Sequence, residues 1–330
     1  MADVSPPRAV GLLGAGVIGA GWAARFLLHG VDVRVFDPDA RAVEHVCAAV
    51  ANARRAYERL MTVELPAEGE LTVVASPEDA ARCAGFVQES VPEREELKRE
   101  LLAAAGAVTA GDVVIASSTS GLLPSRLQAG VPHPARVVVG HPFHPVYLLP
   151  LVEVCGGAET APGAIAWAED VYRAIGMAPL RVRKEVDGFV ADRLLEALWR
   201  EALWLVADGV ATAGEIDDAI RLGAGLRWSF MGTFLAYRMA GGDAGMRGFL
   251  EHFGPALEWP WTKLTDVPQL TPELVDLIAS QSDAQAVGRS LADLERERDD
   301  CLVAVLQALR SCGAGAGAVL AAHEERLRKA

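Results

Sequence analysis

Short apolar runs alternate with longer, more polar stretches over the first half of the chain. The apolar runs are rich in Val, Leu and Ile, which is typical of strands buried in a parallel sheet, and the stretches between them have helical character. Strands are therefore predicted at residues 8–13, 31–36, 71–76, 85–91, 112–117, 137–139 and 151–154, and helices at residues 20–29, 40–61 and 77–82.

The second half of the chain predicts helices only. The helix expected at residues 189–207 is apolar around most of its circumference, which predicts burial on all sides. A small helical domain can bury such a helix only against other helices or a second subunit, so a homodimer formed through this domain is expected. Further helices are predicted at residues 213–222, 230–240, 245–253, 271–281, 290–310 and 318–328.

The two halves predict an α/β fold of two domains. Residues 1–186 are expected to form a Rossmann-type doubly wound parallel sheet, and residues 187–330 an all-α domain. A chain of 330 residues is long enough for two hydrophobic cores.

A glycine turn joins the first predicted strand to the first helix. Gly14 permits a tight turn, Gly16 lets the backbone approach a pyrophosphate, and Gly19 lets helix and strand pack closely. Val17 and Ile18 open the helix, whose N-terminal amides favour an anion. The order of strand, turn and helix predicts a dinucleotide site; the alternative is a chance run of small residues.

Asp37 ends the second predicted strand, 18 positions after Gly19. An acidic residue at this distance is placed to bind the adenosine ribose. Its carboxylate can accept hydrogen bonds from the ribose 2′-hydroxyl of NAD but would repel the 2′-phosphate of NADP. NAD is therefore the expected cofactor.

Composition excludes several classes of partner. The net charge of −13 argues against nucleic acid and against an anionic membrane surface. Five scattered cysteines, without a Cys-x-x-Cys or Cys/His cluster, predict neither a disulfide framework nor a metal site and fit a reducing cytoplasm. The N-terminus has no apolar signal region and no apolar run reaches membrane-spanning length, so a cytoplasmic protein is expected.

An imidazole and a carboxylate follow the sixth predicted strand. His141 comes at the carboxyl end of the run 137–139, where ligands of open α/β sheets bind. Glu153 lies in the apolar run 151–154, where an unpaired carboxylate would be costly to bury. An acid/base pair is predicted; the alternative is a capping histidine and a solvent-facing glutamate.

Four hydroxyl residues, Ser117 to Ser120, follow the fifth predicted strand. They are expected to face the same crevice as His141, because the carboxyl ends of parallel strands meet at one edge. Helix capping explains one such residue more readily than four in a row.

The chain resembles the L-3-hydroxyacyl-CoA dehydrogenase superfamily. The resemblance rests on the glycine turn and on the segments 88–93, 117–120, 140–154 and 187–195, which occur in the superfamily's order. Within the superfamily the chain is most similar to the carnitine branch, through the segments 141–143, 146–150, 196–203, 225–228 and 259–263.

The resemblance implies an NAD-dependent dehydrogenase that oxidises a secondary alcohol. By position, His141 would be the catalytic base, Glu153 its carboxylate partner and Ser120 the group that holds the substrate hydroxyl. The residues near the nicotinamide half of NAD would be Glu93, Lys98 and Ser118.

Two positions depart from the superfamily pattern. His144 stands where the superfamily usually has Asn, and Asp192 where the acyl-CoA branch has Asn; Asp is a feature of the carnitine branch. Two other substrates stay open, a 3-hydroxyacyl-CoA and a sugar acid such as L-gulonate, and so does a non-catalytic, crystallin-like role. His144 has the alternative of a hydrogen bond that only fixes its loop.

A quaternary ammonium substrate requires aromatic faces and negative charge, because it has no N–H to donate. The predicted substrate residues are Phe143, His144, Val190, Ala191, Asp192 and Phe253. For each aromatic residue among them, the alternative is an ordinary place in the hydrophobic core.

Overall fold

The computed structural model describes residues 5–240, 246, 247, 249, 250, 262, 271–274, 276, 277 and 290–329. Phe253, a predicted substrate residue, lies outside the described residues, as do the predicted turns at 241–243 and 259–261. The predicted helices at 245–253 and 271–281 are described only in part.

The chain divides into two compact units. The first unit comprises Met1–Asp192, Asp299–Gly313 and Gly317–Ala330, and the second comprises Arg193–Arg298 and Ala314–Ala316. The first unit thus includes C-terminal segments that the sequence assigned to the helical domain. The boundary predicted at residue 187 stays a prediction.

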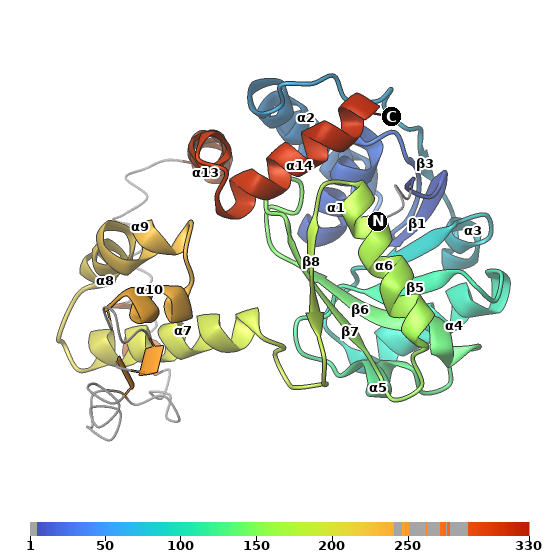
Figure 1. The fold of residues 1–330 in the computed structure, drawn as a ribbon. Coiled ribbons are helices and arrows are strands. Elements are labelled where there is room, and N and C mark those ends of the chain that lie inside the picture. Colours follow the sequence, from blue (N-terminus) through green and yellow to red (C-terminus); the bar gives the residue numbers. More distant parts are fainter. Residues whose placement is uncertain are drawn as a thin grey trace. The chain divides into compact units, whose positions relative to one another are not determined.

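The first unit contains an eight-stranded sheet with the order β3-β2-β1-β4-β5-β6-β7-β8 (Figure 1). The seven predicted strands are present, and an eighth was not predicted. The strands are β1 (Ala9–Leu13), β2 (Asp32–Phe36), β3 (Leu71–Val73), β4 (Phe86–Glu89), β5 (Val114–Ser117), β6 (Val137–Pro142), β7 (Leu151–Gly156) and β8 (Ala178–Val182).

Strand β7 runs antiparallel to β6, whereas every other neighbouring pair in the sheet is parallel. Only residues 143–150 connect β6 to β7. A parallel crossover needs a dozen or more residues, so this short connection requires the reversed direction. The sheet is therefore mostly, and not wholly, parallel.

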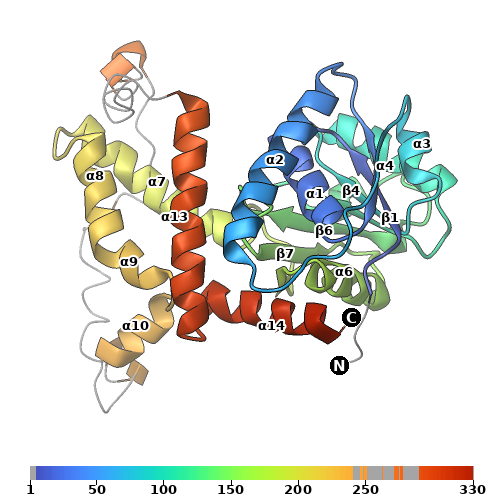
Figure 2. The same ribbon diagram turned by 90° about the horizontal axis from the view of Figure 1, so that it is seen from above.

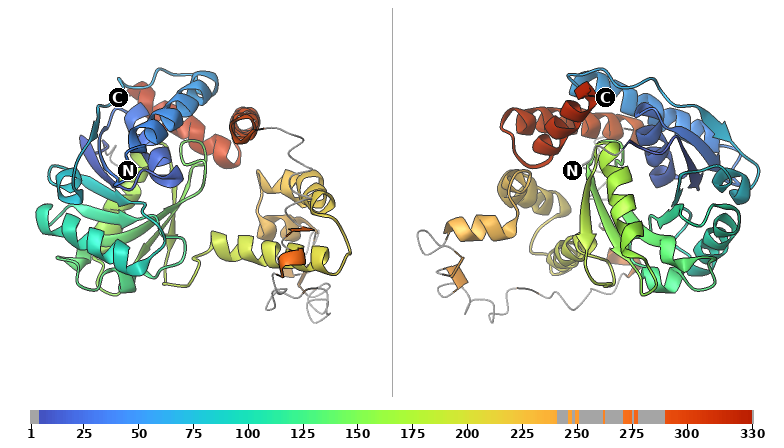
Figure 3. Two further views of the ribbon diagram at one scale, coloured as in Figure 1. Left: turned by 180° about the vertical axis from the view of Figure 1, so that it is seen from behind. Right: turned by 45° about the vertical axis from the view of Figure 1, so that its right-hand side comes forward.

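Helices cover both faces of the sheet (Figure 1; Figure 3). On one face, α3 (Pro77–Ala81), α4 (Glu95–Val108) and α5 (Pro124–Leu127) share a core with the strands. On the other face, Trp22 of α1 (Val17–Leu28) stacks on Tyr172 of α6 (Pro162–Ala174), and α2 (Ala42–Leu60) packs beside α1. The sheet is doubly wound, as the sequence predicted.

The last helix, α14 (Gly315–Lys329), packs on the first unit (Figure 2). Its His323 contacts His29 at the C-terminal cap of α1, and its Arg326 donates to the carbonyl of Arg173 in α6. The preceding helix is α13 (Leu291–Ser311), whose Asp299 accepts a hydrogen bond from the hydroxyl of Tyr147.

The second unit is helical in its described residues. It contains most of α7 (Ala191–Ala207), together with α8 (Ala213–Ala219), a π-helical turn (Ile220–Ala224), α9 (Gly225–Trp228) and α10 (Thr233–Ala240). The single chain leaves large side chains of α7 exposed, Leu194 by 66% and Trp199 by 54%. Among the residues that the structure describes, burial of α7 on all sides, as the sequence predicted, is therefore not found.

No single helix in the described ranges is long and apolar enough to cross a membrane. The pair Ala292–Ser311 and Gly315–Lys329 meets the requirement only when both helices are taken together across a 77° bend.

Candidate active site

The register of β6 and β7 places His141 directly opposite Glu153. The Nδ1 atom of His141 lies 3.0 Å from Oε2 of Glu153. Both side chains are buried. The contact expected between the two residues is present, and it comes from facing positions of an antiparallel pair.

Glu153 is held by hydrogen bonds on both oxygens. The backbone N–H groups of Val190 and Ala191 each donate to Oε1 over 3.0 Å, and His141 occupies Oε2. Burial would raise the pKa of Glu153, but the hydrogen bonds from His141, Ala191 and Val190 outweigh it, so that pKa lies below its ordinary value. Glu153 is therefore ionised at neutral pH.

An ionised carboxylate at Nδ1 determines the tautomer of His141. Since Glu153 can only accept, Nδ1 carries the proton and donates it. The lone pair of a neutral imidazole then lies on Nε2, which is the atom that can take a proton from a substrate. The Oδ2 atom of Asp192 lies 3.7 Å from Nε2.

Two phenyl rings flank the imidazole. The ring centroid of Phe143 lies 4.9 Å from that of His141, and the centroid of Phe189 lies 5.9 Å away. Among the predicted substrate residues, Phe143, Val190, Ala191 and Asp192 are thus gathered around the dyad, whereas His144 is exposed on the same loop as Phe143. Phe189 was not among the residues predicted to contact substrate.

Glu93 links the predicted nicotinamide residues to Ser120. Its Oε1 accepts hydrogen bonds from the Thr119 hydroxyl and, over 3.2 Å, from the backbone N–H of Ser120. Its Oε2 lies 3.2 Å from Nζ of the buried Lys98. Burial would raise the pKa of Glu93, but the hydrogen bonds from Thr119 and Lys98 lower it below its ordinary value. Glu93 therefore fixes the backbone of Ser120, whose own side chain is exposed.

Lys98 is held in place by Glu89, a residue that was not among the predicted site residues. The Nζ atom of Lys98 donates to Oε1 of Glu89 over 2.9 Å and to the carbonyl of Val91 over 3.0 Å. Ser117 donates to the other oxygen of Glu89. Glu89 lies in the segment 88–93, which was part of the resemblance to the superfamily. This motif could therefore have identified Glu89 as a site residue.

A cavity of about 600 Å³ lies over the glycine turn. A Cβ built on Gly16 meets nothing within 4 Å, so the space above this residue is open to a pyrophosphate. A Cβ on Gly19 would lie 2.0 Å from the carbonyl oxygen of Gly14, which explains the glycine there by close packing. Gly14 itself has φ of 99°, in the region that favours glycine.

The cavity wall contains five of the nine predicted cofactor residues, Gly14, Gly16, Val17, Ile18 and Asp37. Asp37 accepts from the backbone N–H of Ala15 on one oxygen and from that of Asp39 on the other. Each oxygen keeps a second lone pair for a ribose hydroxyl. The wall also contains residues that were not predicted: Phe36, Pro38, Ser90, Val91, Pro92, Leu97 and Leu101. These residues fit a dinucleotide.

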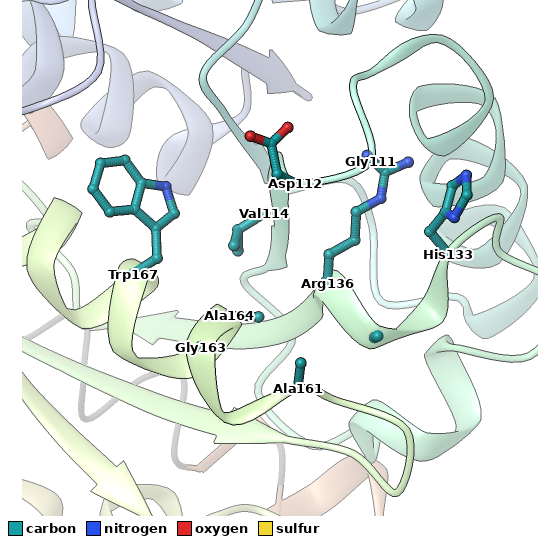
Figure 4. Close-up of a pocket in the computed structure, with 10 residues that line it drawn as sticks. Gly111, Asp112, Val114, His133, Arg136, Ala161, Gly163, Ala164 and Trp167 are labelled. Atoms are coloured by element: carbon teal, nitrogen blue, oxygen red, sulfur yellow. The ribbon is translucent and has the colours of Figure 1, made fainter.

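A second cavity, of about 300 Å³, lies at the amino ends of β5 and β6 (Figure 4). Figure 4 shows Arg136 between Asp112 and His133, with Trp167 on the opposite side. The guanidinium of Arg136 donates to carbonyls at the end of α4, among them that of Gly106 over 2.5 Å. No predicted site residue lines this cavity, and helix capping accounts for Arg136.

Two family models together match most of the chain. The model of the 3-hydroxyacyl-CoA dehydrogenase NAD binding domain matches residues 9–186, and that of the 3-hydroxyacyl-CoA dehydrogenase C-terminal domain matches residues 188–277.

Curated relatives are identical to the chain at more than half of the aligned positions. An L-carnitine dehydrogenase of a Pseudomonas species is 59% identical over 90% of this chain and 92% of its own length. The L-carnitine dehydrogenase of Mesorhizobium japonicum is 53% identical over 96% of this chain and 88% of its own. The L-carnitine dehydrogenase/betainyl-CoA thioesterase of Ruegeria pomeroyi is 52% identical, and the chain spans 65% of its length.

Solved structures share the fold. The 5-formyl-3-hydroxy-2-methylpyridine 4-carboxylic acid 5-dehydrogenase, an NAD⁺-dependent dismutase, superposes with a TM-score of 0.76 at 29% identity and covers 92% of this chain and 98% of its own. The (S)-3-hydroxybutyryl-CoA dehydrogenase of Ralstonia eutropha gives 0.61 at 26% identity and covers 83% of this chain and 94% of its own. The chain belongs to the 3-hydroxyacyl-CoA dehydrogenase family and is an NAD-dependent dehydrogenase that acts on a CH–OH group.

Proposed function

We propose that this enzyme oxidises the 3-hydroxyl of L-carnitine to 3-dehydrocarnitine. The relatives named above support this substrate, and one contact in the site carries the physical argument. The carboxylate of Asp192 lies 3.7 Å from Nε2 of His141, the atom that would bind the hydroxyl. In L-carnitine a single methylene separates the carbinol carbon from the trimethylammonium group. A second methylene separates the carbinol carbon from the substrate carboxylate, so Asp192 would attract the cationic arm and repel the anionic one.

His141 acts as the general base in this proposal. Its Nε2 takes the proton of the substrate hydroxyl while Nδ1–H remains bonded to Glu153, which stabilises the imidazolium that forms. Bound NAD supplies the hydride acceptor. The exposed hydroxyl of Ser120, whose backbone Glu93 fixes, would hold the substrate oxygen.

The trimethylammonium group would be recognised by charge and by aromatic faces. Asp192 supplies the negative charge beside the imidazole of His141. Phe143, which also contacts this imidazole, supplies the aromatic face. A cation over an aromatic face gains up to about 2 kcal/mol in a desolvated site. An uncharged 3-hydroxy acid forfeits that interaction.

NADH formation at alkaline pH tests the substrate. The assay compares L-carnitine, D-carnitine, 3-hydroxybutyrate, 3-hydroxybutyryl-CoA and L-gulonate, and L-carnitine should give the highest kcat/KM. An Asp192→Asn variant should lose at least about tenfold in kcat/KM for L-carnitine, equivalent to about 1.4 kcal/mol. Preference for the CoA ester or for L-gulonate would reject the substrate and leave the dehydrogenase assignment intact. Absence of turnover with L-carnitine would likewise reject the proposed substrate.

We further propose that the protein is a cytoplasmic homodimer. The scattered cysteines support the compartment. The exposed apolar side chains of α7 in the single chain support the dimer.

A further inference from the structure

Four polar side chains meet beside the glycine turn, at the carboxyl ends of β4 and β5. The Oγ atom of Ser118 lies 3.1 Å from Nε1 of Trp22, 2.7 Å from Nε2 of Gln88 and 2.8 Å from Oγ of Ser90. Ser118 was predicted to contact the nicotinamide half of NAD, but it does not line the cofactor cavity, whereas Ser90 does. The direction of each hydrogen bond decides which serine can serve the cofactor.

The amide of Gln88 has one possible orientation. Its Nε2 lies 3.2 Å from the carbonyl oxygen of Gly140, which can only accept, so this side of the amide is the NH₂ group. Its Oε1 accepts from the hydroxyl of Tyr172 over 2.6 Å. Burial raises the pKa of Tyr172 well above its ordinary value, so this hydroxyl keeps its proton. Gln88 is therefore a donor to Ser118.

Ser118 uses both of its lone pairs within this cluster. The indole Nε1–H of Trp22 can only donate, and the Nε2 of Gln88 donates as well. A hydroxyl accepts two hydrogen bonds and donates one. The remaining contact of Ser118, to Oγ of Ser90, must therefore be the one in which Ser118 donates.

Ser90 is left with a proton to donate. It accepts from Ser118, and among the described residues its hydroxyl has no acceptor. A Cβ on Gly14 would lie 2.7 Å from the Ser90 carbonyl oxygen, and one on Gly19 would lie 3.5 Å from the Ser90 Cβ, so Ser90 lies against the turn. The space it faces is the cavity that takes the dinucleotide.

We propose that Ser90 is a cofactor-binding residue, whose hydroxyl donates to a phosphate or ribose oxygen on the nicotinamide side of NAD. Ser118 is a positioning residue in this proposal, because its own donated hydrogen bond turns the proton of Ser90 toward the cavity. The inference concerns the cofactor, and it stands whichever alcohol is the substrate.

Titration of the purified protein with NADH, ADP-ribose and AMP, followed by calorimetry, tests the proposal without turnover. Ser90→Ala should weaken the binding of NADH and of ADP-ribose by about three- to thirtyfold, since one hydrogen bond to a phosphate or ribose oxygen is lost. AMP should bind with unchanged affinity, because it lacks the phosphate and the ribose of the nicotinamide side, which ADP-ribose keeps. The Tm of Ser90→Ala should remain close to that of the unmodified protein.

Ser118→Ala separates the positioning role from the donor role, since the same atoms are removed 2.8 Å away. It should lower Tm, because the buried donors of Trp22 and Gln88 lose their shared acceptor, and it should weaken NADH binding by less than Ser90→Ala does, because Ser90 then keeps its donor and loses only its orientation. The reverse pattern, with NADH affinity lost in Ser118→Ala and kept in Ser90→Ala, would overturn the proposal. So would an equal loss of AMP binding in Ser90→Ala, which would show a general distortion of the cavity.

Discussion

At the residue scale, the buried carboxylate of Glu153 accepts hydrogen bonds from three separate N–H groups. Two backbone N–H groups and one imidazole N–H converge on its two oxygens. The sequence predicted the pairing with His141 because a buried carboxylate needs a partner. It could not predict the other two donors, since Val190 and Ala191 approach Glu153 only through the fold.

Glu153→Gln should lower kcat by about 10²- to 10⁴-fold. The glutamine oxygen must stay on the two backbone N–H groups, so its NH₂ faces Nδ1 of His141. The imidazole then accepts at Nδ1 and carries its proton on Nε2, where it cannot act as a base. Steady-state kinetics and NADH titration should show lost turnover with unchanged cofactor affinity.

Glu169→Gln is a suitable control for that variant. Glu169 is also a buried carboxylate with charged partners, Arg173 and Arg181, but it lies on α6 outside the site. Its substitution should reduce Tm and leave kcat unchanged. Near-normal turnover of Glu153→Gln would make Glu153 a structural residue only.

Asp37 should make the enzyme selective for NAD. Its carboxylate lies in the cavity wall, held in place by the N–H groups of Ala15 and Asp39, so it cannot turn away from a 2′-phosphate without losing both bonds. We expect kcat/KM for NAD to exceed that for NADP by at least about tenfold, or about 1.4 kcal/mol. Asp37→Ser should lower the ratio of kcat/KM for NAD to kcat/KM for NADP. Equal use of both cofactors by the unmodified enzyme would contradict this role.

At the scale of elements, the sequence predicted strands better than their directions. Apolar runs mark β1 to β7 because both faces of the sheet are covered. The short connection 143–150 could have predicted that β7 runs antiparallel to β6. The apolar run 151–154 by itself does not indicate the direction of the strand. Strand β8 was missed because Pro179 and Arg181 interrupt its apolar pattern at the edge of the sheet.

The contact between α1 and α14 could not be predicted, because its two histidines are separated by 294 positions. His29 donates from Nδ1 to the carbonyl of Arg25 over 2.7 Å, so its Nε2 accepts from Nε2–H of His323 over 2.8 Å. Nδ1 of His323 is buried without a hydrogen-bond partner. Two protonated rings would place two N–H groups against each other in this contact, and a proton on Nδ1 of His323 would be buried without an acceptor, so the geometry favours the neutral pair.

Acid should therefore weaken the first unit. Burial lowers the pKa of His29 to about 3 and that of His323 to about 2, the nearby charge of Arg25 adding to both effects. Because the folded pKa values lie below the unfolded value of about 6.5, the pair's contribution to stability is complete above pH 6.5 and is lost as pH falls toward 3. At pH 5 each histidine should cost about 2 kcal/mol of the free energy of unfolding.

Thermal melts at pH 7 and pH 5 test the histidine pair. The unmodified protein should lose more Tm between these two values than a His29→Gln, His323→Gln double variant, which has no proton to gain in the unfolded state. His133→Gln is a control, since this histidine is exposed. An identical acid response in the double variant would show that other groups govern stability in this range.

At the scale of the whole molecule, the balance of buried and exposed apolar surface differs between the two units. Trp22, Phe26, Phe86 and Tyr172 are fully buried in the first unit. Helix α7 leaves Leu194, Leu195, Leu198 and Trp199 exposed, and these residues repeat at the i, i+4 spacing of one helical face. Such an apolar face marks an interaction surface.

A second copy of the chain is the partner expected for α7. Light scattering coupled to size exclusion should give twice the mass of 34.9 kDa for the unmodified protein. Leu194→Lys combined with Leu198→Lys should shift the mass toward the monomer, because a dimer would have to bury two ammonium groups at the centre of its interface on each copy. Val73→Lys, at an exposed position of the edge strand β3, adds the same kind of charge elsewhere and should leave the mass unchanged. A monomeric mass for the unmodified protein would instead mean that the apolar face of α7 serves some purpose other than self-association.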